Sequence, residues 1–186
     1  MNSRFMILML TALLCAPAGA VEIEGVKLAD TATVAGRDLV LNGAGLRKKL
    51  LFDVYVASLY LPVKVSAAAA VFEAEPRRVR IDMLRNVAAD DFLETLKDGI
   101  EANTSQTERA AIQPQVSEFA KVITAIGETK DGDAITLDFV AGNTVVTING
   151  AEKTRIAGEQ FNRALRKVWL GDHPAQADLK TAMLGG

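Results

Sequence analysis

The sequence predicts an α+β protein in which a large antiparallel sheet carries a layer of helices on one face. The predicted strands gather toward the two ends of the chain, and the middle of the chain has a helical pattern of apolar residues. The alternation of single strands and helices that marks a parallel nucleotide-binding sheet is missing. With 186 residues, 49% of them hydrophobic, the chain can form a core of its own.

The first predicted strands precede the helical middle. Val21–Leu28 alternates weakly between apolar and polar residues and is expected to be an edge strand. Arg37–Asn42 is the second strand, and Gly43-Ala44-Gly45 is expected to break it as a turn or a bulge. Leu50–Leu61 has the strongest strand signal. Because both of its faces are mostly apolar, we expect it to lie centrally in the sheet and to be covered on both sides.

The pattern then changes from strand to helix. Val65–Glu73 is expected to form a short helix, and Arg77–Val87 alternates as another strand. Apolar residues recur at helical spacing from Ala88 to Asn103. A second helix is expected from Gln106 to Ile126, interrupted near Pro114 because proline removes a helical hydrogen bond.

Strands and helices follow again in the last third of the chain. Turn signals at Gly142-Asn143 and Asn149-Gly150 separate three short strand patterns. An amphipathic helix and a final helix close the chain. These elements are predicted at Ala134–Val140, Asn143–Asn149, Lys153–Ile156, 159–170 and Gln176–Leu184.

Residues 1–20 have the three-part layout of a secretory signal. Arg4 precedes an apolar run from Phe5 to Leu14, and a small-residue site follows at Ala18-Gly19-Ala20. The run is shorter than the roughly 18 apolar residues of a membrane span, so we expect a cleaved signal and no span in the mature chain. The remaining residues, 21–186, are expected to form a single periplasmic domain without cysteine, which suits an oxidising compartment.

Composition excludes several kinds of site. A net charge of −2 provides no basic field for nucleic acid. One cysteine and one histidine exclude a disulfide framework and the usual zinc sites. The pairs Asp90-Asp91 and Asp131/Asp133 fit a helix N-terminus and a turn better than metal ligands. We therefore expect no nucleic-acid partner, no metal and no cofactor, and the sequence does not predict an oligomeric state.

Arg47 is the strongest candidate for a functional side chain. It is either a solvated turn cation within Arg47–Lys49 or a guanidinium at the floor of an apolar cleft, where it could hold a carboxylate or an enolate oxygen. Tyr55 and Tyr60 differ in strand parity, so only one of them can share a pocket with Arg47. Asn103 continues the apolar stripe of its helix, and it either points into the same interior or caps the helix.

Two segments resemble a known family. LNGAGLRKKLLFDVYVASLYLP, residues 41–62, resembles the start of the chalcone isomerase fold, where a Gly-x-Gly-x-Arg element leads into a strand that ends in Tyr-Leu. GEQFNRALRKVWLGDHPAQADLKTAMLG, residues 158–185, is similar to the C-terminal helices of bacterial chalcone isomerase-like proteins. The resemblance extends over residues 36–185 and implies an open-faced β-sandwich with a cleft between the sheet and its helical layer.

The resemblance also implies functional positions. Plant chalcone isomerases hold the phenolate nucleophile with an Arg and use a Thr, a Tyr and an Asn around an ordered water. Related plant proteins bind fatty acids through an Arg and a Tyr at the carboxylate. Matched by position, the Arg falls on Arg47, the Asn on Asn103, the Thr on Tyr55, the Tyr on Leu96 and a hydroxyl residue of the C-terminal helix on Asn162.

The anion-holding Arg is thus kept, while the hydroxyls that order the water are mostly lost. This favours an exported, non-catalytic protein that binds a fatty acid or another amphipathic carboxylate, with Arg47, Tyr55, Asn103 and Asn162 as ligand contacts. The alternative is an isomerase, an intramolecular lyase of the chalcone isomerase type, with Arg47 as its catalytic residue and an enone or phenolic, flavonoid-like substrate. A third hypothesis is a structural or interaction role in the cell envelope, in which the cleft is closed by side chains.

Overall fold

The structure of the protein, a computed structural model, describes residues 21–186 and has an α+β architecture. Seven antiparallel strands form one sheet: β3 (Thr31–Val34), β4 (Arg37–Lys49), β5 (Phe52–Leu61), β6 (Arg77–Met83), β9 (Ala134–Val140), β10 (Asn143–Ile148) and β11 (Ala151–Ala157). Their order across the sheet is β11-β10-β9-β6-β5-β4-β3, so each strand of the sheet runs antiparallel to its neighbours. The predicted antiparallel sheet is confirmed.

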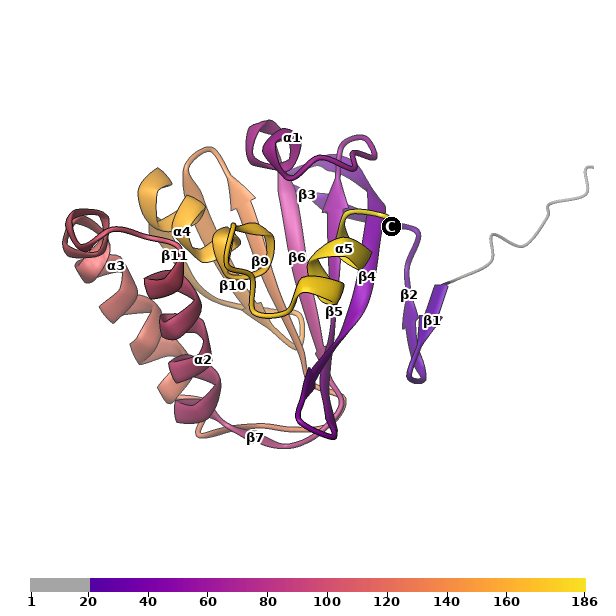
Figure 1. Cartoon of the computed structure of the whole chain (residues 1–186), viewed down its shortest axis with the longest axis horizontal. Coiled ribbons are helices and arrows are strands. Elements are labelled where there is room, and N and C mark those ends of the chain that lie inside the picture. The colour runs from indigo at the N-terminus through magenta and orange to yellow at the C-terminus, as the bar shows by residue number, and fades with distance from the viewer. Residues whose placement is uncertain (1–20) are drawn as a thin grey trace, which may run out of the picture.

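Most of the helices lie over one face of this sheet (Figure 1). They are α1 (Ala68–Glu73), α2 (Ala89–Ala102), α3 (Gln106–Thr124), α4 (Glu159–Leu170) and α5 (Ala177–Met183). Two small two-stranded sheets, β1 (Val21–Ile23) with β2 (Val26–Leu28) and β7 (Val87–Ala88) with β8 (Glu128–Thr129), lie outside the large sheet. In the described part of the chain, no helix has the length and apolar character needed to cross a membrane.

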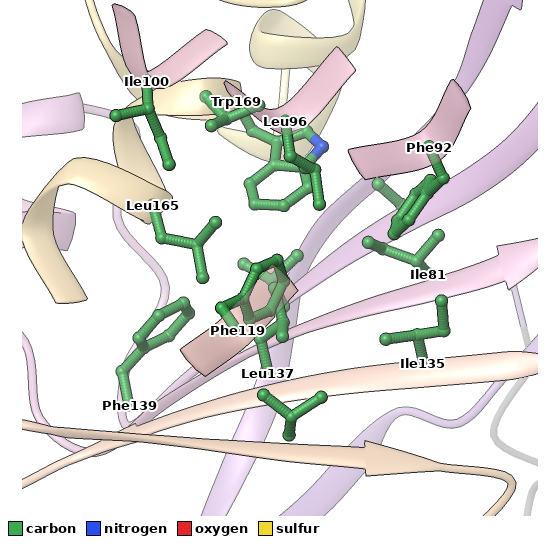
Figure 2. Close-up of a cluster of buried hydrophobic side chains, with 14 of the residues drawn as sticks. Ile81, Phe92, Leu96, Ile100, Phe119, Ile135, Leu137, Phe139, Leu165 and Trp169 are labelled. Carbon is green, nitrogen blue, oxygen red and sulfur yellow. The ribbon is translucent and has the colours of Figure 1, made fainter. Parts of the chain in front are cut away.

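The main core fills the space between the sheet and the helices. Alternate residues of β5 and β6 point into it, because successive side chains of a strand face opposite sides. Figure 2 shows part of this core, in which Leu96, Ile100, Leu165 and Trp169 of the helices lie over Ile81, Ile135, Leu137 and Phe139 of the strands. A smaller core on the opposite face includes Tyr60 and is covered by the N-terminal β1–β2 hairpin. The predicted placement of β5 in the sheet interior, covered on both sides, is confirmed.

The glycine segment acts differently from a strand break. β4 continues for 13 residues through Gly43 and Gly45, with a bulge between Leu41 and Gly43. A Cβ added to Gly43 would lie 2.1 Å from the backbone oxygen of Ala182 in α5, and one on Gly45 would lie 2.8 Å from the Ala182 Cβ. The glycines therefore allow α5 to pack directly on the strand, and of the two predicted alternatives the bulge is confirmed.

Two other expectations were wrong, and one strand was missed. Val21–Leu28 is a separate hairpin and not an edge strand of the large sheet, because Glu24 and Gly25 adopt positive φ angles of 47° and 80° and turn the chain. β3, which was not predicted, forms the edge of the sheet next to β4. The second wrong expectation is the interruption near Pro114, since α3 continues as one helix of 19 residues.

We predict that Gly43→Ala loosens α5 from the sheet. The new methyl group has no space against the α5 backbone, so the helix must move, at a cost of about 1–3 kcal/mol for overpacking. Limited proteolysis should then cut the C-terminal segment faster than in the wild type. Gly36→Ala is a control for general destabilisation, because the added methyl group strains a turn at φ 75° but meets nothing within 4 Å and does not touch α5. Equal protection of α5 in both variants would contradict the close-packing role of Gly43.

Candidate functional site

A cavity of about 360 Å³ lies where the β4–β5 hairpin, the loop after β6 and the start of α2 meet. These elements come together at the lower end of the sheet as drawn in Figure 1. The cavity is lined by Arg47, Lys49, Leu50, Phe52, Val54, Tyr55, Arg85, Asn86, Val87, Ala88, Asp91, Phe92 and Thr95. Side chains therefore do not fill the cleft, which removes the basis of the structural hypothesis.

Arg47 and Tyr55 lie side by side in this cavity. They are direct cross-strand partners in the β4–β5 pair, so their side chains leave the sheet on the same face. The Arg47 Nη1 donates hydrogen bonds to the Lys48 carbonyl oxygen at 2.5 Å and to Gln176 Oε1 at 3.3 Å. Arg47 is partly buried, so the structure supports the cleft interpretation over a fully solvated turn cation.

Tyr55 is the most buried polar residue of the cavity lining. Its side chain is only 3% exposed, and its hydroxyl accepts a hydrogen bond from Trp169 Nε1 at 3.1 Å. Burial raises the pKa of Tyr55, and the Trp169 hydrogen bond and the Arg47 charge offset part of that rise. Tyr55 is thus a neutral phenol at physiological pH, with its own proton free to donate beside a cation. A neutral donor next to a guanidinium is suited to binding a carboxylate.

The other tyrosine is excluded from the cavity. Tyr60 belongs to the smaller core on the opposite face of the sheet. This confirms the prediction that Tyr55 and Tyr60 face opposite sides of their strand. The structure therefore assigns Tyr55, and not Tyr60, to the cleft.

The structure does not bring Asn103 and Asn162 to the cavity. The Asn103 amide nitrogen donates to the carbonyl oxygens of Gly99 and His173, and its amide oxygen accepts from the His173 backbone N–H. Asn103 therefore ties the end of α2 to the loop after α4. The Asn162 amide nitrogen donates to the carbonyl oxygen of Asn143 and so joins α4 to β10. Both amide nitrogens thus bond to backbone carbonyl oxygens, and neither residue lines the cavity.

Leu96 is a core residue outside the cavity lining. It is 2% exposed and packs among the helices and strands of the main core. The hydroxyl that does line the cavity on α2 belongs to Thr95, whose Oγ1 donates to the Asp91 carbonyl oxygen at 3.0 Å. Asp91 and Thr95 are four residues apart, so helical spacing alone could have placed them on one face.

The opening of the cavity carries further residues that the sequence analysis missed. Leu50 and Phe52 are 89% and 56% exposed, and the Arg85 guanidinium lies 4.4 Å from the centre of the Phe52 ring. These residues come from two segments far apart in the chain, so their proximity could not be deduced from spacing.

Two buried arginines outside the cavity, Arg77 and Arg166, have structural partners. The Arg77 Nη1 donates to the carbonyl oxygens of Val71 and Phe72 at the end of α1, and Arg77 also pairs with Glu75. Arg166 pairs with Glu159, and burial lowers the pKa of Arg166 to about 9. This cluster fixes α1 against α4 at the other end of β6 from the cavity. Among residues 21–186, no group of three or more His, Cys, Asp or Glu side chains is placed to hold a metal ion.

The comparisons with known proteins agree with this architecture. Residues 20–185 match the family model described as chalcone isomerase-like. A crystal structure of a fatty-acid-binding protein of Arabidopsis thaliana has a TM-score of 0.69 with the chain at 16% sequence identity, covering 89% of this chain and 95% of that one. None of the curated protein sequences that were compared matches.

The fold is therefore that of the chalcone isomerase-like proteins, a large antiparallel sheet with a helical layer. The chain belongs to the chalcone isomerase-like family, as its sequence resemblance predicted.

We predict that both tyrosines resist ionisation in the folded protein. The chain contains two tyrosines, and burial raises the pKa of Tyr55 and of Tyr60 above the ordinary value of about 10. The native state therefore favours the neutral phenols. The stability they contribute is fully present below about pH 10 and is lost as the pH rises through their folded-state pKa values. When the pH is raised, the phenolate absorbance should increase over the same pH range in which circular dichroism shows unfolding. A phenol that ionises near pH 10 in the folded protein would contradict this placement.

Proposed function

We propose that the protein binds a fatty acid or a similar amphipathic carboxylate in this cavity without transforming it. The observation that carries the proposal is the juxtaposition of Arg47 and Tyr55 in the lining of the cavity. The guanidinium supplies the charge and the phenol supplies a neutral donor, so together they can hold both carboxylate oxygens.

The rest of the lining suits an acyl chain. Val54, Val87, Ala88 and Phe92 contribute apolar surface to the lining beside the Arg47–Tyr55 pair. The volume of about 360 Å³ falls within the range of roughly 300–1,000 Å³ that small-molecule sites occupy. The similar Arabidopsis structure is that of a fatty-acid-binding protein, which supports the same class of ligand.

The isomerase alternative has less support from the residues. Catalysis of ring closure needs positioned acid–base groups, each of which typically contributes about 10²–10⁴-fold. The position expected to carry the catalytic Tyr is Leu96, which lies in the core outside the cavity. Turnover of a chalcone well above background would favour the isomerase and contradict the proposal.

The proposal predicts that Arg47→Ala weakens binding of a long-chain fatty acid. A charge-assisted hydrogen bond contributes about 1.5–3 kcal/mol, so losing the guanidinium should weaken binding roughly ten- to a hundredfold or more. Calorimetric titration measures the affinity directly. Trp169 provides a second readout, because it is the single tryptophan of the chain and bonds to Tyr55.

Lys48→Ala is the matched control for this experiment. Lys48 is the adjacent cation, but its side chain is 56% exposed and pairs with Asp53 at 3.4 Å outside the cavity lining. Its removal should leave the affinity within about twofold of the wild type, because exposed ion pairs contribute little. Equal affinities of the Arg47→Ala and Lys48→Ala variants would overturn the role of Arg47.

We also propose that the protein is exported to the periplasm and cut after Ala20. The support is the order of charge, apolar run and small-residue site in residues 1–20, which lie outside the described part of the structure. N-terminal sequencing of the periplasmic fraction should begin at Val21. Protein that begins at Met1 and stays in the cytoplasmic fraction would contradict export.

A further inference from the structure

The tip of the β4–β5 hairpin exposes three consecutive apolar side chains. Leu50 is 89% exposed, Leu51 is 96% exposed and Phe52 is 56% exposed. Within residues 21–186, the other exposed large apolar side chains are Val21 and Val63, which lie elsewhere in the fold. Single exposed apolar residues are common on soluble proteins, but a concentration at one point marks an interaction surface.

The requirements of the turn do not explain these leucines. Lys49 pairs with Phe52, so Leu50 and Leu51 form a two-residue connection between the strands. Leu50 has a φ of 57°, in the left-handed region where hairpin turns favour Gly or Asn. A leucine at this position is unfavourable for the backbone and unpacked in the fold. Its side chain is therefore suited to a contact outside the molecule.

Positive charge surrounds the apolar tip. At the tip and beside Phe52, the cations Lys48, Lys49 and Arg85 outnumber the carboxylate Asp53, while Arg47 and Asp91 line the cavity. Lys49 immediately precedes the two leucines, and the Arg85 guanidinium lies against the Phe52 ring. The apolar side chains therefore form the apex of the hairpin, and the cations lie next to the apex on the side of the protein body.

We propose that this hairpin tip docks on a bilayer surface that contains anionic phospholipids. The order of groups along the hairpin matches the order of layers in a bilayer, because Leu50 and Leu51 would reach the acyl boundary while Lys49 and Arg85 meet the phosphates. A narrow two-residue apex can insert between headgroups, whereas a protein partner would require a broader complementary surface. The geometry thus favours a lipid surface over a protein.

Docking in this orientation also faces the cavity toward the membrane. Leu50 and Phe52 belong both to the exposed tip and to the cavity lining. An acyl chain could then pass between bilayer and cavity along an apolar edge. This consequence rests on the proposed fatty-acid binding, but the docking itself does not.

Co-sedimentation with vesicles tests the docking. The mature chain, without added fatty acid, should bind vesicles of phosphatidylethanolamine and phosphatidylglycerol, and it should bind vesicles of phosphatidylcholine much less. Leu51→Ser should weaken binding by roughly tenfold or more, because one inserted leucine side chain is lost. Lys49→Glu should weaken it by roughly fivefold or more and reduce its dependence on salt.

The loop after β5 offers matched controls. Val63 and Lys64 are also exposed, and β5 spans ten residues, so they lie about 30 Å from the tip. Val63→Ser and Lys64→Glu should bind vesicles like the wild type. Leu51 makes no buried contact, so Leu51→Ser should unfold at the wild-type temperature, which separates lost docking from lost folding.

Several results would overturn docking. One is that the wild type does not bind the phosphatidylglycerol vesicles, and another is that Leu51→Ser binds them as tightly as the wild type. A third is that the wild type self-associates in analytical ultracentrifugation, that Leu51→Ser abolishes this self-association, and that added vesicles do not change it. Arg47→Ala distinguishes the two proposals. A variant that binds vesicles but no fatty acid supports both, and a wild type that binds fatty acid but no vesicles contradicts docking alone.

Discussion

The hydrogen bond from Trp169 to Tyr55 joins the helical layer to the sheet beside the cavity. Trp169 is on α4 and Tyr55 is on β5, and both side chains are almost fully buried. Because the indole can only donate, the phenol oxygen accepts this bond, and the phenol proton remains available for a second partner. The same bond holds the tyrosine ring next to Arg47. The position of the polar end of the cavity therefore depends on how the helices pack on the sheet.

The β4–β5 pair connects the inside of the molecule with its surface. At one end, Gly43 and Gly45 remove side chains so that α5 can lie directly on β4. Further along, Arg47 faces the cavity, and at the tip Leu50 and Leu51 project into solvent. One hairpin thus contributes in succession to helix packing, to the candidate binding site and to the proposed membrane contact. These three roles fall on one hairpin because β4 and β5 stay paired over most of their length.

The sequence predicted most of the regular structure because hydrophobic periodicity determines which face of an element is buried. The helical stripe that contains Phe92 and Ile100 and the strand alternation that separates Tyr55 from Tyr60 were both confirmed. At Gly43 and Gly45 the sequence predicted a bulge correctly but did not predict that the strand continues. The reason is that these glycines make room for α5, which is more than 130 residues away in the chain.

The candidate site was also predictable only in part, because part of it depends on contacts between segments that are far apart in the chain. Arg47 and Tyr55 are cross-strand neighbours in adjacent strands, so local sequence could pair them. Asn103 and Asn162 were assigned by matching positions in a distant family, but their hydrogen bonds go to the backbone of neighbouring elements. Arg85 lies in the loop after β6, because the strand ends at Met83 and not at Val87 as predicted, and from this loop it reaches the cavity.

The carboxyl group of a bound fatty acid provides the most direct test of the account. The carboxyl carbon of a fatty acid labelled with carbon-13 reports its ionisation in nuclear magnetic resonance spectra. If the carboxylate lies against Arg47 and Tyr55, the bound ligand should have a single shifted resonance and stay ionised well below the pH at which the free acid protonates. A bound carboxyl that titrates like the free acid would contradict the account, because the polar end of the ligand would then lie in solvent.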